Sequence, residues 1–185
     1  MNFQEFGGVA VLTAILASNA PANALNFQTF TDRATWVNAL TATPSLENFN
    51  SFGSDTNFGG SSITAGSLTL SSNADSSSES LIDLPGYGFG ATGVDGTAMV
   101  NMQGLDENES LFVQLPSTFS AFGFGYENYD DGNEAVSVFI SNENVLALPA
   151  SNGSKGFFGI VATDGSFNEV EFRGPAVTDA SSGHF

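Results

Sequence analysis

The segment 121–126 alternates aromatic rings with glycine and reads AFGFGY. Successive side chains of a β-strand point to opposite faces, so this order puts the three rings on one face and Gly123 and Gly125 on the other. Glycine in a helix costs about 1 kcal/mol relative to alanine, whereas large rings in stacked sheets pack well against glycine-lined backbone. The segment therefore predicts a half-buried strand.

Short β-type runs recur along the chain, separated by serine, glycine, asparagine and aspartate. Pro116 lacks a backbone donor and, with Ser117, is expected to end one run and reverse the chain. About eleven strands at this spacing predict an all-β fold, a β-sandwich of jelly-roll or concanavalin-like type. After an opening strand at 25–30, the expected strands are 46–49, 62–64, 67–71, 80–84, 97–102, 111–115, 118–126, 135–140, 145–148, 157–162 and 167–173.

One short N-terminal helix is expected at 32–40. Thr31 is a residue type that caps helices, and Asp32 suits the positive end of the helix dipole. Trp36 and Leu40 fall on one face of this helix, four residues apart. We expect the helix to cover part of the sandwich.

The N-terminus has the pattern of an export signal. An apolar segment at 9–17 precedes Ala22-Asn23-Ala24, which has small residues at the two positions that a signal peptidase recognises. We expect residues 1–24 to be a signal peptide and residues 25–185 to form a single domain of a secreted or cell-surface protein. A buried N-terminal strand or helix is the alternative. A membrane-spanning helix needs about 20 apolar residues, and no later segment qualifies, so the mature chain is expected to have no transmembrane anchor.

Composition excludes several classes of function. The 185 residues include 20 acidic and 3 basic side chains, a formal net charge of −17, which repels the phosphates of nucleic acids and anionic membrane surfaces. Cations are the natural partners, although acidic side chains also serve simply to keep an exported protein soluble. The absence of cysteine excludes disulfides, thiolate metal sites and cysteine nucleophiles.

A carboxylate-rich loop is the candidate metal site. Ca²⁺ takes six to eight oxygen ligands in flexible geometry, and a turn containing glycine can bring several of them together. The loop does not match the register of an EF-hand. The alternative is a solvated loop between strands. The expected ligands are Glu127, Asn128, Asp130, Asp131, Asn133 and Glu134.

Carbohydrate binding is the second hypothesis for an exported sandwich, because exposed aromatic rings stack on sugars. The candidates are Trp36, Tyr87, Tyr126 and Tyr129, three of which adjoin glycine-rich or acidic segments. Packing in the core is the alternative for each ring.

An enzyme is the third hypothesis. The single histidine, His184, is the penultimate residue, which disfavours a catalytic triad. Glu169 and Glu171 fall on one face of a strand, about 7 Å apart, within the range that a glycosidase needs for its carboxyl pair. The Glu-x-Asp-x-Glu pattern of sandwich glycosidases is incomplete here, and an exposed strand face is the alternative interpretation.

Several segments together resemble the exported bacterial β-sandwich proteins of the PEP-CTERM-associated type: Phe30-Thr-Asp-Arg-Ala34 with Trp36, Leu46-Glu-Asn-Phe49, Ala121-Phe-Gly-Phe124, Gly156-Phe-Phe-Gly159 and Phe167 with Val170 and Phe172. The resemblance implies a sandwich fold and an extracellular address, and most proteins of this group have no assigned reaction. We expect a binding, adhesion or matrix role, with a purely structural surface protein as a further alternative. Such proteins continue into a further strand and a sorting tail, so we expect either a domain truncated at Phe185 or a soluble relative freed from the surface.

Overall fold

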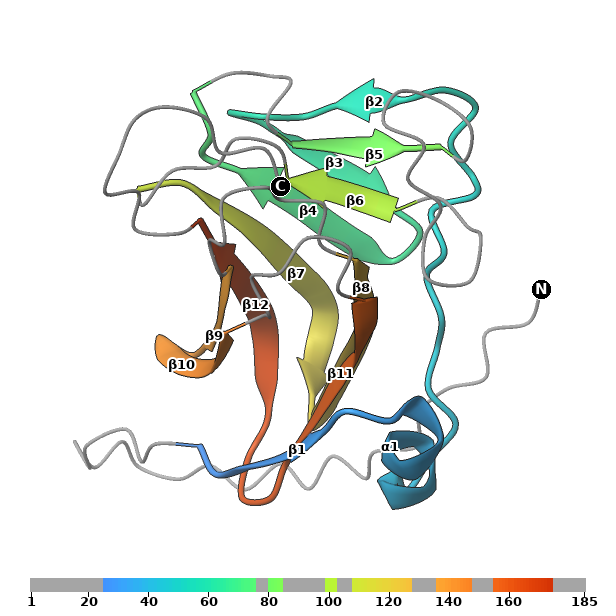
Figure 1. Cartoon of the computed structure of the whole chain (residues 1–185), viewed down its shortest axis with the longest axis vertical. Coiled ribbons are helices and arrows are strands. Elements are labelled where there is room, and N and C mark those ends of the chain that lie inside the picture. Colours follow the sequence, from blue (N-terminus) through green and yellow to red (C-terminus); the bar gives the residue numbers. More distant parts are fainter. Residues whose placement is uncertain are drawn as a thin grey trace, which may run out of the picture.

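The computed structural model describes residues 25–75, 80–84, 99–102, 108–127, 136–147 and 155–174 (Figure 1). Within these ranges the fold is all-β, with one helix and twelve strands in three sheets whose paired strands are all antiparallel. The elements are β1 (Phe27–Phe30), α1 (Arg33–Ala39), β2 (Thr56–Asn57), β3 (Ser62–Ala65), β4 (Leu68–Ser72), β5 (Ser80–Asp83), β6 (Met99–Met102), β7 (Ser110–Phe119), β8 (Ala121–Glu127), β9 (Ser137–Ile140), β10 (Glu143–Ala147), β11 (Lys155–Ala162) and β12 (Phe167–Arg173).

The largest sheet has six strands in the order β10-β9-β12-β7-β4-β3. Its strands alternate between buried apolar and exposed polar positions, which is the pattern of a sheet with one face on the core. Val170, Val113, Leu70 and Ile63 lie next to one another on successive strands and form one row of the inner face. The residues that alternate with these along each strand point to the opposite face, which carries mostly polar side chains together with Phe112 and Phe139.

The second sheet has the order β1-β11-β8 and contributes to the same core. Phe158 and Ile160 of β11 are buried in one apolar cluster with Val170 and Phe172 of β12. Phe124 of β8 lies edge-on to Phe172, with ring centroids 5.0 Å apart. The inward rings of the 121–126 segment therefore pack between the two sheets, as the alternation predicts.

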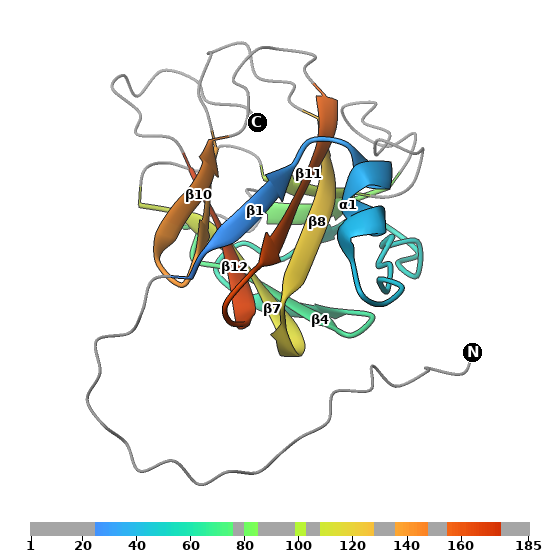
Figure 2. The ribbon, with the colours of Figure 1, turned by 90° about the horizontal axis from the view of Figure 1, so that it is seen from below.

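The helix α1 covers the outer face of this second sheet, and Figure 2 shows it beside β8 and β11. Trp36 is 6% exposed and donates its indole N–H to the carbonyl of Ile160 over 3.1 Å. Asp32, rather than the expected Thr31, caps the helix: its Oδ1 accepts from the backbone N–H of Thr35 over 2.8 Å. The aspartate oxygen reaches this donor because the helix begins at Arg33.

The third sheet, β2-β5-β6, adds Ile82 to the core. Beside it lies a small buried polar contact, in which the hydroxyl of Ser80 donates to the hydroxyl of Ser72 over 2.8 Å. Both serines are nearly inaccessible, with 0% and 6% exposure, so the hydrogen bond offsets the cost of burying them.

The prediction that Pro116 ends a strand was wrong. β7 runs through it to Phe119, because Pro116 lies in an irregular stretch where residues 115–118 oppose only Asn168 of β12. No ladder donor is required there, so proline is tolerated. The chain instead changes sheets at Ser120, between β7 and β8.

Two other expectations differ from the structure. Residues 46–49 form no strand, and Phe49 has a positive φ of 56°, which is incompatible with an extended run. The short strand β2 was not expected, because two residues in a serine- and glycine-rich stretch carry no period-2 pattern. The expected signal peptide at 1–24 lies outside the described residues. Within the described ranges, no helix has the length and apolar character to cross a bilayer.

Candidate functional site

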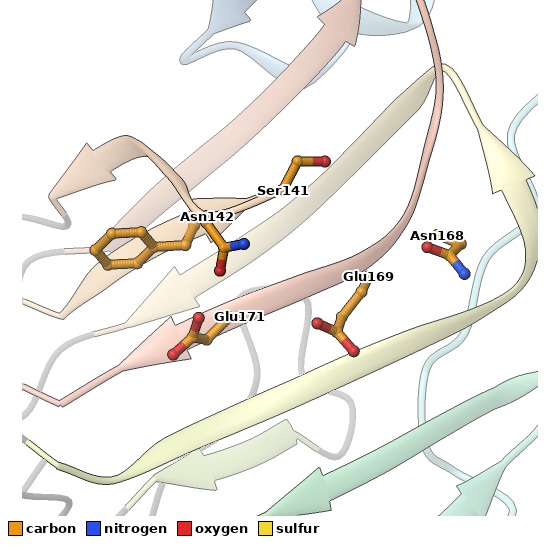
Figure 3. Close-up of a pocket in the computed structure, with 6 residues that line it drawn as sticks. Ser141, Asn142, Asn168, Glu169 and Glu171 are labelled. Carbon is orange, nitrogen blue, oxygen red and sulfur yellow. The ribbon is translucent and has the colours of Figure 1, made fainter. Parts of the chain in front are cut away.

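A polar hollow on the outer face of the six-stranded sheet is the candidate site (Figure 3). It lies over β12, beside the turn that joins β9 to β10, and has a volume of about 130 Å³. Figure 3 shows Glu169 and Glu171 on β12, with Ser141 and Asn142 on the neighbouring turn. The lining residues are Phe139, Ser141, Asn142, Asn168, Glu169 and Glu171.

The hollow forms where β9 separates from β12. These strands are paired only as far as Phe139, which lies opposite Glu171. Continuing the same register would place Ser141 opposite Glu169, but the chain turns at Ser141 and returns as β10 along the other edge of β9. The outer face of β12 therefore loses its neighbouring strand at Glu169, and the gap is bordered by polar side chains.

The turn itself has an unusual backbone. Ser141 and Asn142 have φ values of 52° and 64°, and they connect the paired residues Ile140 and Glu143. Two central residues with positive φ define a type I′ hairpin turn, in which Asn-Gly is the favoured sequence. A positive φ is costly for serine. Turn formation alone therefore does not explain why position 141 is a serine.

Glu171 is held rigidly at one end of the hollow. Its Oε1 accepts from the hydroxyl of Ser110 over 2.6 Å and from Nε of Arg173 over 3.1 Å, while Oε2 accepts from Nη2 of Arg173 over 3.1 Å. The guanidinium also lies 4.0 Å from the centre of the Phe139 ring. Arg173 thus fixes both a carboxylate and an aromatic wall of the hollow.

Glu169 is the exposed carboxylate of the site. Next to it, the backbone carbonyl of Asn168 accepts a hydrogen bond from Nε2 of Gln114 over 2.8 Å, which fixes the bulged backbone that precedes Glu169. The side chains of Asn168 and Asn142 are also exposed. The hollow therefore presents carboxylate, amide and hydroxyl groups to solvent, together with one half-buried ring.

The size of the hollow limits what it can hold. Its 130 Å³ is well below the pocket of about 300 Å³ or more that encloses a drug-sized ligand. The groups present are hydrogen-bond donors and acceptors. They suit one small polyhydroxylated group that remains partly in solvent.

The expected calcium ligands cannot be assembled from the described part of the chain. Residues 128–135 lie outside it, and Glu127 is described only as the last residue of β8, paired with Lys155. Among the described residues, no three His, Cys, Asp or Glu side chains form a group that could hold a metal ion. The calcium site stays a prediction.

The aromatic candidates do not form an exposed platform where they are described. Trp36 is buried against β11, because its ring occupies the space above glycines, so its assignment as an exposed binding residue was wrong. Tyr126 is half-buried and packs against the core beside Phe124, with ring centroids 6.4 Å apart. Tyr87 and Tyr129 lie outside the described residues.

Glu169 and Glu171 do share one face of β12, opposite the buried Val170 and Phe172, and both line the hollow. Sequence reasoning missed their neighbours Phe139, Ser141, Asn142 and Asn168. The Ser-Asn step between two β-type runs was the available signal for the turn. The bulge that exposes Asn168 had no signal in the sequence.

Comparison with protein-family models, with curated proteins and with solved structures found no match to this chain. The site must therefore be interpreted from its own chemistry.

Proposed function

We propose that this chain is an extracellular β-sandwich protein of jelly-roll type that binds a neutral glycan at the hollow beside the β9–β10 turn. The proposal rests on one observation. Glu169, Asn142 and Ser141 line the same solvent-facing hollow as the Phe139 ring. A carboxylate accepts hydrogen bonds from the vicinal hydroxyls of a sugar, and an amide both donates to them and accepts from them. An aromatic ring packs against the C–H face of the sugar.

The charge of the chain supports a neutral ligand. With a formal charge of −17 and two carboxylates at the hollow, an acidic glycan would be repelled unless cations bridged it. A neutral sugar avoids this repulsion and still uses the carboxylates as acceptors. The resemblance to exported PEP-CTERM-associated sandwiches supports the extracellular address, and calcium bound at the 127–134 loop would be compatible with it.

Glycan hydrolysis is the second candidate, favoured by the common face of Glu169 and Glu171. A general acid must present a proton to the leaving oxygen. Three hydrogen bonds from Ser110 and Arg173 already occupy most of the acceptor sites of the Glu171 carboxylate, which fits a positioning role better than that of a proton donor. The geometry therefore favours binding, in which Glu171 and Arg173 keep the hollow in shape.

The test is a titration of the full chain with neutral glucan, xylan and mannan oligosaccharides, repeated with calcium and with a chelator. We expect saturable binding of at least one series, weakened by Glu169→Gln and by Asn142→Ala but not by Gln28→Ala, an exposed amide on β1. Calcium-dependent melting together with calcium-dependent affinity would support the loop as a metal site. Release of reducing sugar that Glu171→Gln abolishes would instead support the hydrolase.

A further inference from the structure

The outer face of the six-stranded sheet continues the site beyond the hollow. Glu169 on β12 lies directly opposite Gln114 on β7, which lies opposite Thr69 on β4, which lies opposite Thr64 on β3. Residues paired in this way point to the same face of a sheet. Four polar side chains therefore form one row across four strands, which we call the polar row. Gln114 in this row already donates one N–H to the carbonyl of Asn168.

The polar row is accessible along its length. Glu169, Thr69 and Thr64 are exposed, and Gln114 is half-exposed. Strands in a sheet are about 4.8 Å apart, so the row extends about 14 Å from the hollow toward β3.

A second row runs alongside the first and has a different composition. Phe139, Glu171 and Phe112 lie opposite one another on β9, β12 and β7, followed by Ser71 on β4 and Ser62 on β3. The two half-buried phenylalanines flank Glu171, and the serines continue the row toward β3. The face thus offers rings near the hollow and hydroxyl groups farther away.

We propose that the polar row binds the successive units of a linear neutral polysaccharide whose end or substituent enters the hollow. This inference rests on the proposed function and specifies its ligand as a polymer rather than a single sugar. Hydrogen-bonding groups repeated at strand spacing match a chain of repeating hydroxylated units. The threonine and serine positions offer no large apolar area of the kind that a protein partner or a second sheet would bury.

The test uses substitutions that remove a hydroxyl and keep the shape of the side chain. Thr64→Val and Thr69→Val retain the branched side chain that strands favour, so the fold should be kept. Thr29→Val is the matched control, because Thr29 is exposed on β1 in a different sheet. Dissociation constants are measured for neutral oligosaccharides of one series, from the disaccharide to the hexasaccharide.

For the wild-type chain, we expect affinity to rise with oligosaccharide length until the polar row is filled and then to remain constant. Each threonine variant should weaken binding of the hexasaccharide by about fivefold and leave binding of the disaccharide unchanged. The reason is that only the longer ligand reaches the threonine and loses a hydrogen bond to it. The Thr29 variant should change neither.

Two results would overturn the inference in distinguishable ways. If short oligosaccharides bind and depend on Glu169, but affinity does not rise with length or ignores Thr64 and Thr69, the polymer is wrong and the proposed function stands. If no oligosaccharide binds the wild-type chain at any length, the proposed function fails and the polymer fails with it.

Discussion

Gly123 of β8 and Gly159 of β11 lie directly opposite each other, and the indole of Trp36 lies over both. A Cβ at Gly159 would be 2.6 Å from Cδ1 of Trp36, and one at Gly123 would be 3.2 Å from its Cε2. No side chain fits there. The two glycines therefore leave the space in which Trp36 packs, and this contact holds α1 against the sheet.

Gly159→Ala should destabilise the fold by about 1–3 kcal/mol, because the new methyl group overlaps a ring whose N–H is bonded to Ile160. The control is Gly53→Ala, where a Cβ meets nothing within 4 Å and little change is expected. Urea unfolding measured by the fluorescence of the single tryptophan gives both values. Equal stability of the two variants would contradict the packing described.

A change of sequence in the β9–β10 turn should raise the stability of the fold and lower the affinity of the hollow for its ligand. Replacing Ser141-Asn142 by Asn-Gly supplies residues that adopt positive φ readily, so the free energy of unfolding should rise by about 0.5–1 kcal/mol. The same double variant removes a hydroxyl and an amide from the hollow and should bind the ligand less tightly. Calorimetric melting and titration on one preparation measure both. A variant that is more stable and binds the ligand equally well would show that the turn side chains do not contribute to binding.

The Glu171–Arg173 pair should contribute modestly to stability. The side chain of Arg173 is 40% exposed and that of Glu171 is 13% exposed, so solvent screens the pair in part. Arg173→Met keeps the apolar length of the side chain and should cost about 1 kcal/mol through the lost ion pair and ring contact. A double-mutant cycle with Glu171→Gln measures their coupling, and zero coupling would show that the two residues act independently.

Acid should weaken the attachment of β1. The backbone N–H of Asn26 donates to Oδ1 of Asp164 over 2.8 Å, and this bond and one from the Asn26 side chain lower the pKa of Asp164 below its ordinary value of 3.8. A carboxyl with a depressed pKa in the folded chain stabilises the fold above the unfolded pKa, and this contribution is lost as pH falls through the folded pKa. Asp164→Asn should therefore be less stable than the wild type at neutral pH.

The difference between Asp164→Asn and the wild type should shrink as pH falls below about 3.8. Urea unfolding across a pH series measures it. Asp75→Asn, at another exposed carboxyl, controls for the loss of one negative charge in an acidic chain. A difference that stays constant down to the lowest pH would mean that the hydrogen bonds of the ionised carboxylate do not hold β1.

Sequence periodicity was a good guide wherever a strand has one buried face. The 121–126 alternation and the common face of Glu169 and Glu171 both follow from period-2 geometry, which is local information. The helix was also predictable from its capping residue types, and Trp36 is its buried residue. The expectation that Leu40 shares its face was wrong, because the helix ends at Ala39 and Leu40 has an extended backbone. The cap of the helix was misassigned by one residue, since Thr31 and Asp32 are both capping types.

The site was less predictable, because it depends on register between segments distant in sequence. The hollow exists where β9 separates from β12, and the polar row depends on Thr64, Thr69, Gln114 and Glu169 sharing one register. Nothing local to any of these residues indicates their neighbours. The burial of Trp36 was unpredictable for the same reason. The glycines beneath its ring come from two strands that are more than thirty residues apart in the sequence.

The most direct test of the account is calorimetric titration of the full chain with a neutral hexasaccharide of the series that binds best, comparing the wild type with Glu169→Gln. We expect saturable binding that is weakened by about fivefold or more in the variant, while Gln28→Ala binds as the wild type does. Equal affinity of the wild type and Glu169→Gln for this ligand would contradict the assignment of the hollow as the glycan site.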